Sequence, residues 1–378
     1  MKRTLLRLTC GLVAAAPLLV VGAAPASVPT TAATPPAPAY VFTDLGVLGG
    51  LDSRGHALGS SGYAAGLADT SPGSWIFGFH AFRWEPVRPG ATTGTIVDLG
   101  ALHRRDLSAA TAVNASGVTV GVSLPPTGGS TAFVYDGTLR ALPGLGGRLS
   151  SAADVNDRGQ VVGEARRANG RDHAVLWQPP RGAGQAFEVV DLGRPAGRFA
   201  TSATAVNERG LVVGAVADRD GYAVAAVWTP DRPHGSTGTW LELPVVPGAT
   251  GSVAEDVNRS GVVVGQADPR RGDRGWLWDG RMHLLPPLPG GDATYAYGVN
   301  DAGVTAGCSN VADFSARAVL WRDGQAIDLN DLMPAWAVEA GYVLREAHEI
   351  NDHGQVVGVA SIGDHAHAFL LTPAENWS

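Results

Sequence analysis

The sequence is poor in cysteine, in basic residues and in long hydrophobic runs, and each shortage narrows what the protein can be. Its only cysteines are Cys10 and Cys308, and Cys10 lies in a segment that we expect to be cleaved, so no intramolecular disulfide is expected. Cleavage would remove three of the 28 basic residues and none of the 35 acidic ones, which leaves a net charge of −10. This charge argues against non-specific binding to nucleic acid or anionic membranes.

The one extended apolar run lies near the N-terminus. Residues 1–26 resemble a secretory signal peptide, with a basic start, an apolar stretch at 12–21 and a small-residue cleavage site at 24–26. The stretch is shorter than the roughly 20 residues that span a bilayer, so we expect no transmembrane anchor; an uncleaved anchor is the alternative. Residues 27–39 form a leader rich in Pro, Ala and Thr, and 40–378 form the folded domain. The chain is therefore predicted to be secreted.

Glycine and proline are abundant. The 51 glycines and 25 prolines make up about a fifth of the chain. A helical bundle is excluded, because Gly and Pro cost roughly 1 and 3 kcal/mol in helix interiors. The glycines follow no strict period of three, which excludes collagen, and a hydrophobic content of 45% excludes a wholly disordered chain. A turn-rich, mostly β protein remains.

An internal repeat explains the glycines. A motif of the form Val-Asn-x-x-Gly-x-Val-Val-Gly occurs six times, 42 or 51 residues apart, and a degenerate seventh copy carries Gly59 in place of Asn. The repeated residues are Asn114, Asn156, Asn207, Asn258, Asn300 and Asn351, and Gly117, Gly159, Gly210, Gly261, Gly303 and Gly354. Asn and Gly at this spacing are typical of a tight hairpin turn. A polar ring of Asn side chains around a channel is the alternative.

Each copy is followed by two further strand-like segments, such as His173–Trp177 and Val190–Gly193. Each unit therefore supplies four short strands. The seventh unit ends at Leu371 without a fourth strand, whereas an unmatched one opens the domain at Tyr40–Gly46. We predict an all-β, seven-bladed β-propeller of four-stranded blades, whose ring closes when the N-terminal strand joins the last blade. An open β-solenoid or a tandem of small sandwiches is the alternative.

These landmarks resemble the bacterial extracellular family named for its His-Ala-Phe motif, the HAF repeat. The matching residues are His80-Ala81-Phe82 and His367-Ala368-Phe369, the Asp-Leu-Gly-x-Leu-Gly-Gly element at 44–50, and the Asn-x-x-Gly-x-Val-Val-Gly elements at 156–163 and 351–358. The resemblance covers about residues 40–371. It implies a secreted protein, and it implies no reaction.

Motifs for chemistry are scarce. The sequence contains no Gly-x-Ser-x-Gly elbow, phosphate loop or dinucleotide fingerprint, so no cofactor is predicted and an enzyme is not favoured. The last unit concentrates histidines, of which His348, His365 and His367 form a weak candidate for a metal site. His367 aligns with His80 and His173, which favours a repeated structural role instead. We therefore predict no metal.

The loops that should share one face of the ring carry arginine and aromatic residues. The candidate ligand-binding residues are Arg104, Arg105, Arg166, Arg271, Tyr295, Trp75 and Trp336. Arginine forks suit carboxylate and phosphate groups, although solvated loops with Arg–Asp pairs are the simpler interpretation.

The function predicted from these features is a secreted, monomeric binding module. Its ligand, an acidic glycan, a cell-wall polymer or a protein, would lie on this loop face near the central tunnel. An extracellular polysaccharide hydrolase or lyase with its site at the tunnel mouth is one alternative, and a structural envelope protein is another.

Overall fold

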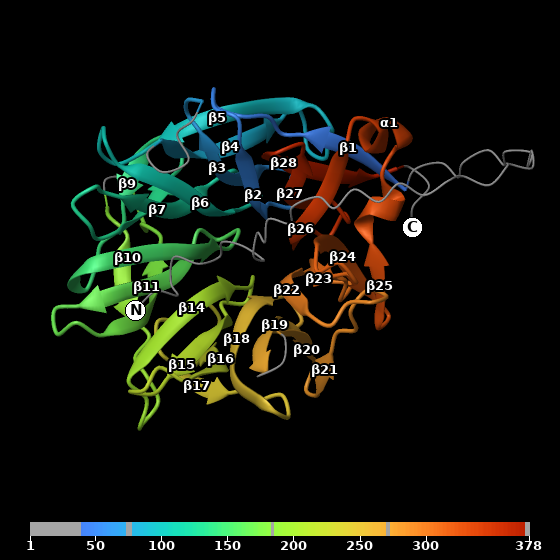
Figure 1. Cartoon of the computed structure of the whole chain (residues 1–378). Helices are drawn as coiled ribbons and strands as arrows, with labels where there is room; N and C mark the ends of the chain where they lie inside the picture. The colour runs from blue at the N-terminus through green and yellow to red at the C-terminus, as the bar shows by residue number, and fades with distance from the viewer. Residues whose placement is uncertain (1–38, 73–77, 183–184, 270–272, 375–378) are drawn as a thin grey trace, which may run out of the picture. The chain divides into compact units, whose positions relative to one another are not determined.

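The chain forms a ring of seven four-stranded antiparallel sheets, or blades (Figure 1). The structure is a computed structural model that describes residues 39–72, 78–182, 185–269 and 273–374. In six blades the four strands are hydrogen-bonded in sequence order. The all-β, seven-bladed propeller predicted from the repeat is confirmed.

The first four blades occupy the N-terminal half of the ring. Blade 1 contains β2 (Ser53–Leu58), β3 (Ala64–Asp69), β4 (Phe79–Pro86) and β5 (Gly94–Gly100). Blade 2 contains β6 (Leu107–Val113), β7 (Thr119–Leu124), β8 (Thr131–Tyr135) and β9 (Leu139–Ala141). Blade 3 contains β10 (Gly146–Val155), β11 (Val161–Arg167), β12 (Asp172–Gln178) and β13 (Glu188–Asp191). Blade 4 contains β14 (Ala200–Val206), β15 (Val212–Ala217), β16 (Ala223–Pro230) and β17 (Gly238–Glu242).

The last three blades complete the ring. Blade 5 contains β18 (Ala249–Val257), β19 (Val263–Pro269), β20 (Arg274–Trp278) and β21 (Met282–Leu284). Blade 6 contains β22 (Thr294–Val299), β23 (Thr305–Asn310), β24 (Ala316–Arg322) and β25 (Gln325–Asp328). Blade 7 contains β26 (Tyr342–Ile350), β27 (Val356–Ile362) and β28 (His365–Pro373). A short 3-10 helix, η1 (Leu329–Leu332), and helix α1 (Ala335–Glu339) connect blades 6 and 7. No helix in the described residues is long and apolar enough to cross a membrane.

The N-terminal strand closes the ring. Strand β1 (Tyr40–Asp44) pairs antiparallel with β28, with Phe42 opposite Leu371. It thereby becomes the fourth strand of blade 7, as the unmatched segment at Tyr40–Gly46 predicts. Pairing with β1 covers the outer edge of β28, so the last blade has four strands like the other six.

The innermost strands define the axis of the ring. The first strand of each blade contacts the first strands of both neighbouring blades, and β26 contacts β2. Figure 1 shows these strands (β2, β6, β10, β14, β18, β22 and β26) around the middle of the ring. Side chains on them are therefore the ones closest to the axis.

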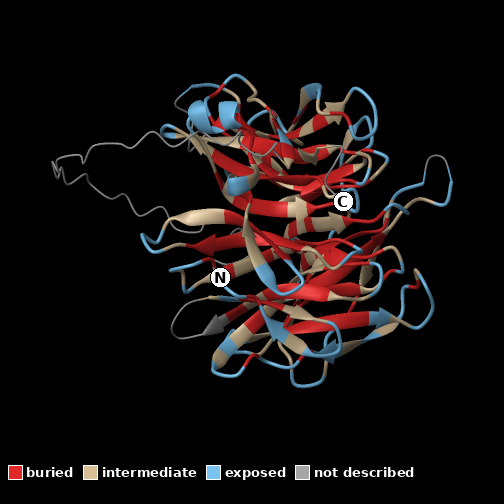
Figure 2. Ribbon diagram, turned by 90° about the vertical axis from the view of Figure 1, so that its right-hand side faces the viewer, coloured by how far each residue is buried: buried red, intermediate tan, exposed pale blue. Residues whose placement is uncertain are grey.

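Tryptophans of the third strands form the core between blades. Trp177, Trp228, Trp276 and Trp321 are almost fully buried. Trp177 Nε1 donates to the Pro143 carbonyl oxygen of blade 2 at 2.7 Å, so the indole fastens one blade to the one before it. Figure 2 shows that the buried residues lie mostly in the strands and the exposed residues mostly in the loops.

The third-strand and fourth-strand motifs of the repeat contact each other within a blade. The histidine of the third strand contacts the aspartate of the fourth: His80 with Asp98 at 3.0 Å, and His173 with Asp191 at 2.8 Å. Asp98 also accepts a hydrogen bond from the Gly100 amide at 2.7 Å. The aspartate therefore fixes both the histidine and the glycine turn after the fourth strand.

Candidate functional site

The repeated asparagines form a belt of hydrogen bonds around one face of the ring. In blade 2, Asn114 Oδ1 accepts from the amides of Ser116 and Val118 at 3.0 Å, which builds the hairpin turn. Its Nδ2 donates to the main-chain oxygen of Asn156 in the next blade at 3.1 Å. The other five repeat this link, Asn156 to Asn207, Asn207 to Asn258, Asn258 to Asn300, Asn300 to Asn351 and Asn351 to Gly59. All six asparagines are buried. Each one both builds its own hairpin turn and links its blade to the next, so the role of the belt is structural.

The innermost strands differ from blade to blade at two positions, five and three residues before the asparagine. Blades 2, 3 and 4 carry small residues there, namely Ala109 and Thr111, Ser151 and Ala153, and Ser202 and Thr204. Blades 6, 7 and 1 carry Tyr295 and Tyr297, Glu346 and His348, and Arg54 and His56. We call these last six residues the axial cluster. Blades 2 to 4 fold without such side chains, so the fold does not explain them.

Aromatic contacts join the axial cluster across three blades. The His348 ring stacks on Tyr297 with centroids 5.0 Å apart and an interplanar angle of 9°. On its other side, His348 lies 5.5 Å from the His56 ring. Tyr297 stacks in turn on Tyr295 at 6.4 Å. Side chains that are 292 residues apart in sequence therefore meet where the last blade adjoins the first.

A buried hydrogen-bonded pair forms the polar centre of the axial cluster. His348 Nε2 donates to Glu346 Oε2 at 2.9 Å, and both side chains are more than nine-tenths buried. Burial raises the pKa of the Glu346 carboxyl, but the hydrogen bond from His348 and the charges of His348, Arg54 and His56 outweigh it and hold the pKa below its usual value. The site therefore holds an ionised carboxylate with a histidine fixed against it.

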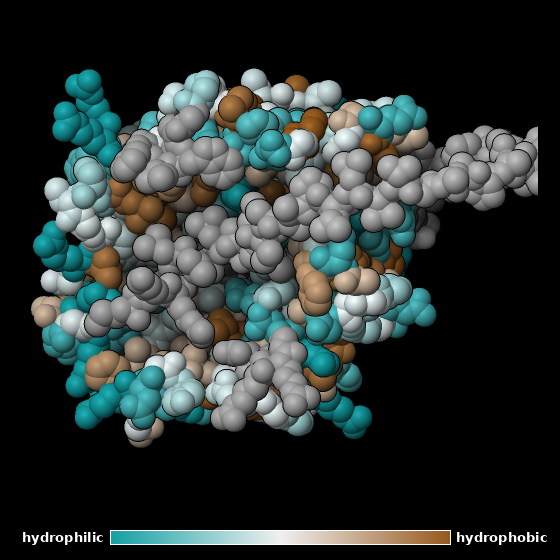
Figure 3. Space-filling view, in the orientation of Figure 1, coloured by the Kyte–Doolittle hydropathy of each residue, from teal (hydrophilic) through white to brown (hydrophobic). Residues whose placement is uncertain are grey.

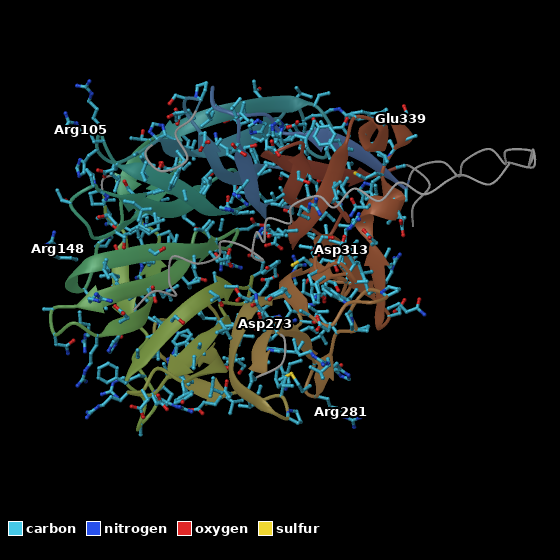
Figure 4. The ribbon with its side chains drawn as sticks, in the orientation of Figure 1. Arg105, Arg148, Asp273, Arg281, Asp313 and Glu339 are labelled. Atoms are coloured by element: carbon cyan, nitrogen blue, oxygen red, sulfur yellow. The ribbon has the colours of Figure 1, made fainter. Side chains whose placement is uncertain are left out.

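Three neighbours orient the remaining rings. His56 Nδ1 lies 3.1 Å from the Ala110 carbonyl oxygen of blade 2, and Tyr297 Oη lies 3.8 Å from Cys308 Sγ. Tyr295 Oη donates to the Asp273 carboxylate. In Figure 4, Asp273 lies nearer the middle of the ring than Arg105, Arg148 or Arg281, which lie at its rim. The axial cluster thus extends to the loop between β19 and β20.

The ligand-binding residues predicted from the sequence do not converge. Arg104 and Arg105 are exposed between β5 and β6, and Trp336 is exposed on α1, with its ring 5.8 Å from Phe42. Arg166 pairs with Asp172 through two bonds of 2.7 and 2.8 Å. Trp75 and Arg271 lie outside the described residues. Tyr295, expected in a loop, lies on β22 and belongs to the axial cluster. Figure 3 shows a rim of mostly hydrophilic side chains around this ring.

The three histidines of the weak metal candidate have separate partners. His348 bonds to Glu346, His367 Nδ1 bonds to Asp44 at 2.6 Å, and His365 lies 3.6 Å from Asp52. Within the described parts of the chain, no three His, Cys, Asp or Glu side chains come together in a way that could hold a metal ion. His348 lies on β26 and His365 on β28.

Sequence reasoning missed four members of the axial cluster: Arg54, His56, Tyr297 and Glu346. The signal was present in the repeat. Aligning the seven copies on their asparagines would have shown that these positions carry large polar residues in blades 6, 7 and 1 and small residues in blades 2, 3 and 4, while blade 5 carries Val253 and Glu255. The axial cluster occupies positions at which the seven copies differ, whereas the repeat was defined by the positions at which they agree.

Comparison with known proteins places the chain in a family. The sequence model described as "Protein of unknown function (DUF3466)" matches residues 149–369, more than half of the chain. The chain belongs to the DUF3466 family. No curated protein matches this DUF3466 sequence.

Solved structures similar to this DUF3466 chain share the propeller arrangement. YCF48 bound to D1 peptide is 11% identical with a TM-score of 0.50, and the match covers 93% of this chain and 99% of that one. The Pyrococcus horikoshii acylaminoacyl peptidase is 10% identical with a TM-score of 0.47, over 89% of this chain and 52% of that one. Trypanosoma rangeli sialidase is 10% identical with a TM-score of 0.40, over 85% and 55%. At these identities the likeness concerns the fold alone.

Proposed function

We propose that this DUF3466 protein is a secreted binding module of the HAF-repeat type that holds an extracellular glycan at the axial cluster. One observation carries the proposal: three consecutive blades place Tyr, His, Glu and Arg at inner-strand positions where blades 2, 3 and 4 carry Ala, Ser or Thr. In a repeat protein, residues that the repeat does not need are retained for another reason. Secretion is supported by the signal-like segment at residues 1–26.

The chemistry of the axial cluster fits a sugar. Stacked aromatic rings offer faces on which the C–H groups of a pyranose pack, and a few fixed polar groups then select its hydroxyls. Tyr295 and Tyr297 are half-buried and provide the stacked rings, while Glu346 provides an ionised acceptor.

A second candidate function is hydrolysis or elimination on the same glycan. The His348–Glu346 pair favours it, because a histidine oriented by a carboxylate is a common general base, and Tyr297 stacks directly on that histidine. A catalytic site would release product, whereas a binding module would not.

The repeat itself supplies the variant that tests the proposal. The axial swap variant Tyr295→Ser, Tyr297→Thr, Glu346→Ser and His348→Thr gives blades 6 and 7 the residues of blade 4 (Ser202 and Thr204), so the fold should persist. The control Ala109→Ser with Ala153→Thr changes the same two positions in blades 2 and 3.

The measurement is a glycan and cell-wall array, followed by calorimetry on the tightest ligand and an assay for released sugar. We expect the wild type and the control to bind equally and the axial swap variant to lose at least about tenfold in affinity, or about 1.4 kcal/mol. Equal binding by the axial swap variant would overturn the proposal. Sugar release by the wild type would establish the catalytic alternative.

A further inference from the structure

Two arginines from neighbouring blades converge on one phenylalanine at a distance from the axial cluster. The guanidinium carbons of Arg171 and Arg219 lie 5.0 and 6.0 Å from the centre of the Phe199 ring. Arg171 ends the turn between β11 and β12, Arg219 lies in the turn between β15 and β16, and Phe199 directly precedes β14. Arg219 is exposed, and the other two are half-buried. We call these three residues the arginine clamp.

The phenylalanine orders the two cations without using their hydrogen-bond donors. A guanidinium that lies over an aromatic ring is held by its face, which leaves the N–H groups at its edge available. Over the described ranges, neither the Arg171 nor the Arg219 side chain donates a hydrogen bond or forms an ion pair with the protein. Both groups therefore have N–H donors that no protein acceptor in the described residues occupies.

Four carboxylates near the clamp have other partners, and a fifth, Asp220, is exposed beside Arg219. Asp172 pairs with Arg166, and Asp191 Oδ2 lies 3.1 Å from Arg167 Nε. Glu242 takes Arg198 Nε at 2.7 Å. Asp218 Oδ1 accepts from the main-chain amides of residues 220 and 222 at 2.9 and 3.0 Å. Arg171 and Arg219 thus contact the same ring, and neither is hydrogen-bonded to a carboxylate in the described part of the chain.

The repeat does not require the clamp. Phe199 lies eight residues before its asparagine, and the residues at that position in the other blades are Leu51, Asp106, Arg148, Thr250, Asp292 and Val343. An aromatic side chain occurs there in blade 4 alone. Loops between second and third strands share one face of an antiparallel ring, so the clamp lies on the same face as Asp273, the partner of Tyr295.

We infer that the arginine clamp binds an oxyanion on the glycan, either the carboxylate of a uronic acid or a sulfate ester. The inference rests on the proposed function in taking the ligand to be a glycan, and it names that ligand as an acidic one. A planar guanidinium edge matches both groups in geometry. The net charge of −10 expected for the secreted chain would repel acidic polymers in general, so binding requires a local site.

The test uses the full chain with polygalacturonate, dextran sulfate and uncharged dextran as probes at physiological salt. The clamp variant Arg171→Gln with Arg219→Gln is compared with Arg148→Gln with Arg281→Gln, which removes the same charge from two exposed rim positions. Phe199→Leu keeps both charges but removes the aromatic ring. The axial swap variant is measured in parallel.

We expect the wild type to bind polygalacturonate or dextran sulfate but not dextran, and whichever acidic polymer binds identifies carboxylate or sulfate as the group recognised. The clamp variant should lose at least about tenfold in affinity, Phe199→Leu about threefold or more, and the rim control less than twofold. Equal losses in the clamp variant and the rim control, or no binding of either acidic polymer by the wild type, would overturn the inference. If only the axial swap variant loses affinity, the clamp is refuted and the proposed function stands. If only the clamp variant loses affinity, the clamp stands and binding at the axial cluster is refuted.

Discussion

Asn351 Nδ2 donates to the main-chain oxygen of Gly59 at 3.2 Å, across 292 residues of sequence. This hydrogen bond completes the asparagine belt between the last blade and the first. Gly59 is the one member of the series without a side-chain amide, and the packing explains why: a Cβ atom at residue 59 would lie 2.7 Å from the Asn114 oxygen. The exception in the repeat is therefore a place where blades 1 and 2 approach too closely for a side chain.

Restoring the motif should consequently harm the protein. We expect Gly59→Asn to lower the free energy of unfolding by about 1 to 3 kcal/mol, the usual cost of forcing extra atoms into a packed site. Urea denaturation measures the loss. Ser60→Asn, which places the same side chain at the exposed neighbouring position, should change stability by less than about 0.5 kcal/mol. A Gly59→Asn protein as stable as the wild type would show that the two blades can separate at little cost.

The closure of the ring should depend on pH. Asp44 on β1 accepts from His367 Nδ1 at 2.6 Å, from Tyr342 Oη at 2.7 Å and from the Gly46 amide at 2.8 Å. Burial raises the pKa of Asp44, but these hydrogen bonds outweigh it and hold the pKa below its usual value. The hydrogen bond to Asp44 raises the pKa of His367 against the effect of burial.

The directions of the two pKa shifts define the pH range in which the Asp44–His367 pair stabilises the fold. A lowered Asp44 pKa gives stability that is present above about pH 4 and lost as pH falls through the folded value; a raised His367 pKa gives stability present below about pH 6.5 and lost as pH rises through the folded value. The melting temperature of the wild type minus that of His367→Gln should therefore be largest at pH 5 to 6 and shrink by pH 9. The exposed His103→Gln serves as control. A difference that stays constant with pH would contradict the assignment, and deleting residues 40–46 should lower the melting temperature at every pH.

Individual residues show how much of the fold and of the candidate site could be predicted from the sequence. The number of blades and the closure by β1 were predictable because each blade is specified locally by its own Asn turn, Trp strand and Asp-Leu-Gly strand. Tyr295 was placed in a loop because its inner strand begins earlier than the hydrophobic alternation suggests. The contact of His348 with His56 could not be predicted from the sequence, because it depends on which residues face each other once the ring has closed.

Glu164 on β11 should make stability fall as pH rises. Burial, together with the nearby charge of Asp172, raises the pKa of Glu164 to about 7, although Arg166 opposes the shift. The folded protein then binds more protons than the unfolded chain between about pH 4.5 and 7, so the free energy of unfolding decreases across that interval. Glu164→Gln should remove this slope and raise the melting temperature at pH 8. The exposed Glu188→Gln should keep the wild-type slope, and an unchanged slope in Glu164→Gln would refute the prediction.

Two glycines of blade 4 should respond differently to the same substitution. Gly214 ends the repeated motif opposite a bulge in β14, and a Cβ atom there would lie 2.1 Å from the Ser202 oxygen. The neighbouring strand has no room to move, because it packs on blades 3 and 5. Gly221 has a φ of 87° but open space around it, so an added Cβ meets only backbone strain.

We therefore expect Gly221→Ala to cost about 1 kcal/mol and Gly214→Ala several times more, measured by urea denaturation or by the soluble yield where the variant does not fold. Equal losses would mean that backbone conformation alone selects glycine at both positions. A larger loss at Gly214 would show that the glycine ending the repeated motif is selected by the close approach of the innermost strand, an approach that the equivalent glycines of all seven blades share.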